Sequence, residues 1–118
     1  NPAGYITSGP LANYLPLSGG TLTGALNSSS TITASGGFFN SDMRLKDIIS
    51  RDGDVVVFKW KDGRDDKTHI GYVAQEVQEI LPDTIKEGED GILSVNYIEV
   101  LVAKILKMEK EIELLKSK

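Results

Sequence analysis

Residues 96–116 read NYIEVLVAKILKMEKEIELLK, and their apolar side chains follow the seven-residue repeat of a coiled coil. The apolar positions are spaced 3, 4, 3, 4 and 3 residues apart, and they are Ile98, Leu101, Ile105, Met108, Ile112 and Leu115. The pattern predicts one long helix with an apolar seam. Because an isolated helix of this length is marginal in water, we expect partner chains to cover the seam.

Charged residues beside this seam favour a parallel homo-oligomer. The g positions hold Lys104 and Glu111, and the e positions hold Glu109 and Lys116. In a parallel assembly each g residue faces the e residue five positions on in its neighbour, so both pairs join opposite charges. The alternative is a terminal helix that docks on its own domain. The pattern alone leaves a dimer and a trimer open, although Met108 at d and Val102 at e widen the apolar stripe and suit the higher order.

The first third of the chain has a different chemistry. Residues 1–40 contain no charged residue, whereas residues 41–118 carry all 17 acidic and 13 basic residues. Three of the four prolines and seven of the twelve glycines also lie in residues 1–40, which argues against helices there. We expect short strands with glycine turns, buried against copies of the same chain. The abrupt change at Asn40-Ser41 predicts a boundary between two domains.

Between this boundary and the long helix, the pattern predicts a small α+β domain. Ser41-Asp42 is a helix-capping signal, and Asp52-Gly53 is a turn signal. Pro82 ends a short helix. The predicted elements are a short helix over residues 43–49, strands over 55–61 and 68–74, a helix over 75–81, and hairpin strands over 84–86 and 92–95. The expected fold class is therefore α+β, with an extended β segment before this domain and a coiled-coil helix over about residues 96–116 after it.

Composition excludes several classes of function. The net charge of −4 disfavours a general nucleic-acid binder, and no apolar run reaches the length of a membrane span. The absence of cysteine rules out disulfides and thiolate chemistry, and a single histidine, His69, excludes a two-histidine metal site. We expect His69 to be a hydrogen-bonded structural residue, and we expect no metal, cofactor, nucleic acid or membrane partner. Because the chain starts at Asn1, we expect a piece of a longer protein.

Ser41 and Lys46 form the candidate catalytic pair. A serine beside a lysine can perform nucleophilic catalysis without histidine, provided that the lysine is neutral. Free lysine has a pKa of about 10.4, so its environment must lower the pKa by about 3 units. In the predicted helix over residues 43–49, Lys46 lies in the first turn, where the helix dipole also disfavours a cation. The alternative is that Ser41 or Asp42 only caps a helix and that Lys46 is a solvated surface residue.

The spacing of the pair restricts its geometry. Five residues along an α-helix turn by about 140°, so Ser41 and Lys46 cannot meet on one helix. Ser41 must lie in extended chain before the helix, or Lys46 must come from another subunit. In both cases we expect the pair to form only in the folded, assembled protein.

Four blocks of the second part resemble the C-terminal intramolecular chaperone domain of phage tail spikes and tail fibres. The blocks are SDMRLK at residues 41–46, IGYVAQEV at 70–77, Leu81-Pro82, and VNY at 95–97. The resemblance is to the domain of endosialidase tailspikes and L-shaped tail fibres, and a related auto-cleaving domain occurs in the myelin regulatory factor. Residues 14–24 are similar to a segment that recurs in phage tail-fibre proteins.

This resemblance implies a homotrimeric domain, residues 41–118, that assists the folding of its own fibre domain, residues 1–40, and then cuts itself off. It implies that Ser41 is the nucleophile, that Lys46 is its base and that the cut falls between Asn40 and Ser41. It also implies assembly in the host cytoplasm, with the fibre part in the virion tail and the chaperone part released or loosely retained.

Two alternatives remain beside this interpretation. The chain could be a structural trimerisation module at a fibre tip, without proteolysis, or a receptor-binding end. Asn40 could also cyclise and break the same bond slowly, by a route that needs no Lys46. For the enzymatic route we expect backbone N–H groups near Gly36-Gly37 to bind the oxyanion.

Overall fold

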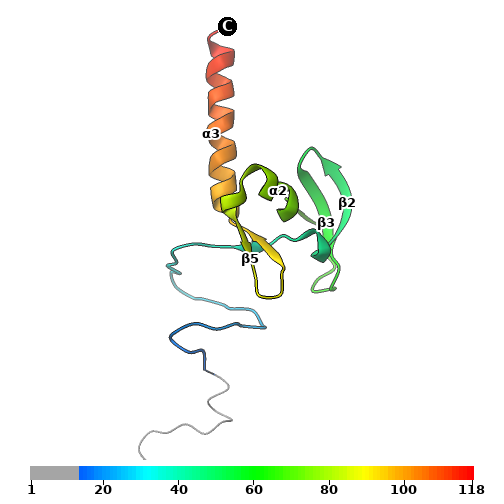
Figure 1. The fold of residues 1–118 in the computed structure, drawn as a ribbon, viewed down its shortest axis with the longest axis vertical. Helices are drawn as coiled ribbons and strands as arrows, with labels where there is room; N and C mark the ends of the chain where they lie inside the picture. Colours follow the sequence, from blue (N-terminus) through cyan, green and yellow to red (C-terminus); the bar gives the residue numbers. More distant parts are fainter. Residues whose placement is uncertain (1–13) are drawn as a thin grey trace, which may run out of the picture. The chain divides into compact units, whose positions relative to one another are not determined.

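The computed structural model describes residues 14–118, and the chain divides into two units, residues 1–33 and residues 34–118 (Figure 1). Residues 14–33 of the first unit form turns and extended chain without a helix or strand. Their large apolar side chains are exposed, namely those of Tyr14, Leu15, Leu17, Leu22, Leu26 and Ile32. The strands expected in this segment are therefore not formed by one chain alone. Their formation against copies of the chain stays a prediction.

The second unit has the α+β fold that the sequence predicts. Its elements are β1 (Phe39–Asn40), the 3₁₀ turn η2 (Met43–Leu45), β2 (Lys46–Asp52), β3 (Val55–Trp60), β4 (His69–Gly71), α2 (Ala74–Ile80), the 3₁₀ turn η3 (Pro82–Thr84), β5 (Ile85–Glu87), β6 (Leu93–Val95) and α3 (Tyr97–Lys116). The strands form two antiparallel three-stranded sheets in the orders β2-β3-β4 and β1-β6-β5. The unit begins before the change in composition, so residues 34–40 fold with the charged part of the chain.

The helix predicted over residues 43–49 is wrong. Only Met43–Leu45 form a single 3₁₀ turn, in which the Arg44 N–H donates to the Asp42 side chain, and Lys46 already begins strand β2. The β-branched Ile48 and Ile49 favour a strand, and β2 pairs along its length with β3. The cap signal was therefore correct, but tertiary pairing ends the helical turn after three residues.

The β2–β3 hairpin confirms the predicted turn at Asp52-Gly53. Gly53 takes a positive φ of 61° at the turn, a conformation that glycine adopts without strain. Along β3, Val56 and Phe58 are buried, and together with Val73 they form one apolar cluster. This cluster forms a wall of the site described below.

The second sheet places the end of the uncharged segment, at Phe39–Asn40, against the charged part of the chain. Strand β1 pairs with β6, with Phe39 opposite Val95 and Asn40 opposite Ser94. The β5–β6 hairpin forms as predicted, and Gly91 has a positive φ of 79° in its turn. The chain thus enters the domain as an added edge strand, and the Asn40-Ser41 bond lies at the end of that strand.

A second apolar cluster joins α2, the β5–β6 hairpin and the start of α3. Its buried members are Ala74, Val77, Leu93, Val95 and Val100. The short helix predicted over residues 75–81 is confirmed as α2, and η3 follows it from Pro82. Val100 is the one buried residue of α3, so only the first turns of this helix dock on the domain.

The rest of α3 extends beyond the other elements of its unit (Figure 1). The helix starts as predicted after Asn96, whose side chain accepts a hydrogen bond from Glu99 N. All six seam side chains are exposed, with exposed fractions between 44% for Leu101 and 68% for Leu115. Lys104 forms an ion pair with Asp54 of its own chain, which competes with its predicted pairing to Glu109 of a neighbour. Among residues 14–118, none of the helices combines the length and the apolar character needed to cross a membrane.

Candidate active site

Ser41 occupies a short extended link between β1 and η2. Its backbone N–H donates to Leu93 O at 3.2 Å, and its carbonyl accepts from Ala74 N at 2.8 Å. Its side chain is fully buried. The residue is therefore fixed on both sides by the β5–β6 hairpin and by the start of α2.

Lys46 reaches Ser41 within the same chain. Lys46 Nζ lies 2.7 Å from Ser41 Oγ, and Lys46 is only 3% exposed. The contact is possible because the 3₁₀ turn of residues 43–45 reverses the chain between the two residues, so neither of them is helical. This agrees with the expected extended position of Ser41, and the lysine of a second subunit is not needed.

Burial lowers the pKa of Lys46 from its ordinary value of 10.5 to about 8. The ammonium lies 4.2 Å from the centre of the Phe58 ring and 5.8 Å from that of Trp60. Within residues 14–118, no ion pair joins Lys46 to a carboxylate that would hold it charged. The dipole contribution expected from a first helical turn is wrong because Lys46 lies on a strand. At pH 7 about a tenth of the chains would carry a neutral Lys46.

Two tyrosines complete the polar contacts of Ser41. Ser41 Oγ lies 2.5 Å from the backbone carbonyl of Tyr72, to which it donates, and 2.7 Å from Tyr97 Oη. Lys46 Nζ donates to the same Tyr72 carbonyl at 2.6 Å. The sequence alone assigns neither group a role. A sequence gives no signal for a backbone carbonyl. It gives a weak signal for Tyr97, which is a polar aromatic residue just before the apolar seam.

Asp42, next to Ser41, is a fully buried carboxylate with its own partners. It accepts hydrogen bonds from the backbone N–H, Nε and Nη2 of Arg44, and from Leu93 N at 3.0 Å. The Arg44 guanidinium, helped by the Arg44 and Leu93 backbone N–H groups, holds the pKa of Asp42 well below its usual 3.8, against the opposing effect of burial. Asp42 therefore stabilises the turn that brings Lys46 back to Ser41.

The peptide bond between Asn40 and Ser41 lies beside this cluster. Because Ser41 N bonds to Leu93 O, Asn40 occupies the next, non-hydrogen-bonded position of the β1–β6 ladder, and its carbonyl points away from β6. Ser94 Oγ donates to Asn40 Oδ1 at 3.1 Å. A hollow of about 310 Å³ adjoins the residue and is lined by Phe38, Phe39, Asn40, Trp60 and Arg64.

The expected oxyanion donors and the histidine lie apart from these contacts. Among residues 14–118, no hydrogen bond from Gly36 or Gly37 to Asn40 is formed, so their role stays a prediction. His69 contacts both carboxylate oxygens of Asp65 at 3.0 Å and stacks on Phe58, which agrees with the structural role expected of it. Within the same residues, no group of three or more His, Cys, Asp or Glu side chains could hold a metal ion.

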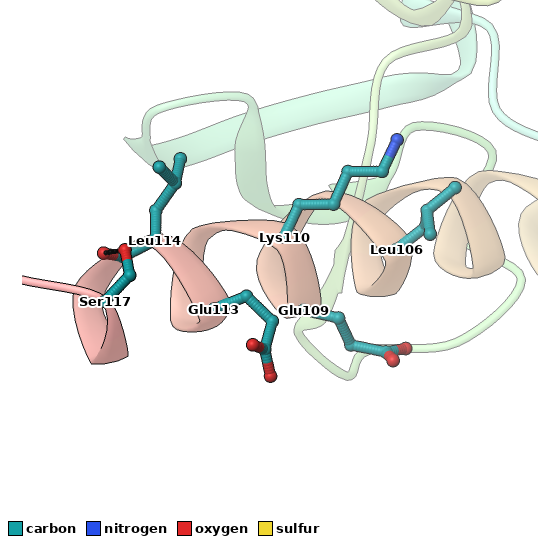
Figure 2. Close-up of a pocket in the computed structure, with 6 residues that line it drawn as sticks. All are labelled: Leu106, Glu109, Lys110, Glu113, Leu114 and Ser117. Carbon is teal, nitrogen blue, oxygen red and sulfur yellow. Dashed lines mark hydrogen bonds between the residues drawn. The ribbon is translucent and has the colours of Figure 1, made fainter.

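A second hollow, of about 530 Å³, lies on the surface of α3 (Figure 2). Its lining comes from one helix only, as Leu106, Glu109, Lys110, Glu113, Leu114 and Ser117. Figure 2 shows these side chains spread along the helix surface rather than converging on a point. No polar group of the Ser41 cluster takes part in it, so the candidate site remains the cluster around Ser41.

One family model matches part of the chain. Residues 41–86 match the family model described as chaperone of endosialidase. The matched stretch contains Ser41, Lys46 and Tyr72, it ends before Tyr97, and it spans less than half of the chain. No curated protein and no solved structure matches the chain significantly. The match confirms, for residues 41–86, the resemblance of this chain to the C-terminal chaperone domain of endosialidase-type fibres.

Proposed function

We propose that residues 41–118 are an intramolecular chaperone that drives the trimerisation and folding of a phage tail fibre and then releases itself by cutting the Asn40-Ser41 bond. The family match supports the chaperone role and makes self-cleavage a reasonable expectation. The observation that carries the proposal is the 2.7 Å contact between Lys46 Nζ and Ser41 Oγ. It occurs where burial lowers the pKa of Lys46 to about 8.

The chemistry would run in two steps. A neutral Lys46 takes the proton of Ser41, and Ser41 Oγ attacks the carbonyl carbon of Asn40. The bond from this carbon to Ser41 N breaks, the nitrogen receives the proton from Lys46, and an ester joins Asn40 to the Ser41 side chain. Water then hydrolyses the ester, which leaves a carboxylate on Asn40 and a hydroxyl on Ser41. The hollow beside Asn40 offers this water an approach.

The position of β1 supports the same proposal. Phe39–Asn40 bind to β6 as an added antiparallel strand, which is a common way for proteins to hold an extended peptide. This pairing fixes the residue before the bond, while the hydrogen bonds of Ser41 to Leu93 and Ala74 fix the residue after it. Because the residues on both sides of the bond are already fixed, little conformational entropy is lost when the reaction begins.

The exposed seam of α3 supports the trimer. Its six apolar side chains, at exposed fractions of 44% to 68%, would be covered by two neighbouring copies of the helix. The pair Glu111–Lys116 provides a charge match between parallel neighbours that the ion pair of Lys104 does not disturb. In this proposal the domain assembles with its fibre in the host cytoplasm, and the fibre part enters the virion tail.

The intact mass of the full chain tests the proposal. We expect the wild-type chain to give two fragments, residues 1–40 and 41–118, and both Ser41→Ala and Lys46→Ala to stay whole. Lys59→Ala serves as a matched control, because Lys59 is an exposed lysine of strand β3. If all chains stay whole as stable trimers, the protein is a structural trimerisation module instead. Cleavage that persists in Lys46→Ala would indicate cyclisation of Asn40.

A further inference from the structure

We infer that the hydroxyl of Tyr97 is a third catalytic group, which donates a hydrogen bond to Ser41 Oγ and stabilises the negative charge that forms there as Lys46 takes the proton. The inference rests on the proposed function. It also connects the reacting atom to α3, because Tyr97 is the first residue of that helix.

The direction of the hydrogen bond follows from the neighbours of Tyr97. Tyr72 N–H donates to Tyr97 Oη at 3.1 Å, so the hydrogen of Tyr97 must find an acceptor elsewhere. Two oxygens lie within reach, Ser41 Oγ at 2.7 Å and the Tyr72 carbonyl at 3.3 Å. The Tyr72 carbonyl already accepts shorter hydrogen bonds from Ser41 and Lys46, which use both of its lone pairs. Ser41 Oγ is therefore the acceptor for Tyr97.

The protons of the cluster can be followed through the first step. While Lys46 is charged, Ser41 donates to the Tyr72 carbonyl, and Ser41 Oγ accepts from both Lys46 and Tyr97. Once Lys46 is neutral, its lone pair can take the Ser41 proton, and Tyr97 keeps its own proton throughout. The Tyr97 hydrogen bond then points at an oxygen that is gaining negative charge, where such a bond is at its strongest.

The surroundings of Tyr97 are built to hold the hydroxyl in place. Its ring stacks on Tyr72, with centroids 5.7 Å apart, and meets Phe39 of β1 edge-on at 6.1 Å. A Cβ on Gly71 would lie 2.8 Å from Tyr97 Oη, so the absence of a side chain there makes room for the hydroxyl. The other neighbours of such a Cβ lie at ordinary contact distances, 3.6 Å or more.

The test compares Tyr97→Phe with the wild-type chain. Each full chain is collected in denaturant and refolded into buffers from about pH 6 to about pH 10, and the rate of cleavage at Asn40-Ser41 is followed by intact mass. We expect Tyr97→Phe to lower the plateau rate by about 10- to 100-fold, the usual effect of losing one hydrogen bond to a developing charge. The pH midpoint should stay at the wild-type value, because Lys46 keeps its surroundings. Tyr14→Phe, which makes the same change at an exposed side chain, is the matched control.

A second variant keeps the phenol and shifts its hydroxyl, together with the ring, away from Ser41 Oγ. Gly71→Ala should slow cleavage in the wild-type chain, where the new methyl group displaces Tyr97 Oη. It should have little effect in the Tyr97→Phe background, where no hydroxyl is left to displace. Equal slowing by Gly71→Ala in both backgrounds would contradict the inference.

The outcomes separate this inference from the proposed function. A wild-type chain that does not cleave refutes the proposed function, and the inference falls with it. A Tyr97→Phe chain that cleaves at the wild-type rate overturns the inference alone. A slower Tyr97→Phe chain whose midpoint moves toward the pKa of free lysine also overturns it, because the hydroxyl would then act by keeping water away from Lys46.

Discussion

The site around Ser41 and the helix α3 depart from the usual distribution of side chains in opposite ways. At the site, charged groups are buried, since Asp42 is fully buried and Lys46 is 3% exposed. Along α3, apolar groups are exposed, with all six seam side chains at 44% or more. Within residues 14–118, every buried polar side-chain atom of the domain has a hydrogen-bond partner, whereas the seam lacks apolar cover in a single chain.

The groups proposed for the reaction and the surface proposed for assembly therefore lie in different parts of the chain. Lys46, Tyr97 and the carbonyl of Tyr72 contact Ser41 Oγ within one chain, so the fold of one chain brings these groups together. The helix, in contrast, leaves its apolar seam exposed in a single chain, and other copies would cover that seam in the proposed trimer. Tyr97 is the one residue that belongs to both regions, at the first position of α3 and in contact with Ser41.

The largest effect is expected from charges placed in the seam. We expect Ile105→Asp combined with Ile112→Asp to abolish association, because each isoleucine contributes roughly 1.5–3 kcal/mol of burial and three chains lose on the order of 10 kcal/mol together. Analytical ultracentrifugation should find single chains. If assembly and chemistry are separate as described, these chains still cleave at Asn40-Ser41. A folded single chain that does not cleave would show that the site needs a neighbour.

A smaller effect is expected at the buried carboxylate of the site. In a Ser41→Ala background, which keeps the chain whole, Asp42→Ala should lower the free energy of unfolding by about 3 kcal/mol, since it leaves the buried Leu93 N–H without its acceptor. The folded pKa of Asp42 lies below its unfolded value of 3.8, so this stability is present above about pH 4 and is lost as the pH falls further. Urea unfolding of the two chains above and below about pH 4 measures this loss of stability.

The second Asp-x-Arg pair of the chain provides the matched control. Asp62 accepts from the backbone and side chain of Arg64 as Asp42 does from Arg44, but its side chain is 52% exposed. Asp62→Ala should leave the unfolding midpoint unchanged within error. Equal losses for the two variants would mean that the pairing matters and the burial does not.

A third variant tests how much the burial of Lys46 lowers the free energy of unfolding. In the Ser41→Ala background, Lys46→Met should raise the free energy of unfolding at pH 7 by about 2 kcal/mol, because it removes a charge held in an apolar setting. Between about pH 8 and pH 10.5 the unfolded chain binds the extra proton, so the parent gains stability with rising pH and the difference should shrink. Lys59→Met, at an exposed position, is the control. A destabilised Lys46→Met chain at pH 7 would contradict the account.

Much of the fold could be predicted from local patterns in the sequence. The turn at Gly53, the hairpin of β5 and β6, the helix ended by Pro82 and the start of α3 after Asn96 all depend on residues close in the chain, where propensity and turn chemistry act directly. The predicted helix over residues 43–49 failed because pairing with β3, a tertiary effect, outweighed the capping signal.

The candidate site, like the fold, could be predicted from the sequence only in part. Ser41 and Lys46 could be proposed from their residue types and from family resemblance, and the structure brings them together at 2.7 Å. The carbonyl of Tyr72 could not be predicted, because a backbone atom has no residue type to recognise. Tyr97 lies 56 positions after Ser41, and only the folded chain shows that the two side chains meet.

The dependence of the cleavage rate on pH tests whether burial makes Lys46 the base for Ser41. The full wild-type chain is refolded at a series of pH values, and the fragments 1–40 and 41–118 are quantified over time. We expect a rate that rises with pH to a plateau, with a midpoint near 8 where Lys46 loses its proton, and no such rise in Lys46→Ala. A wild-type rate independent of pH, or one that still rises toward the pKa of free lysine, would contradict it.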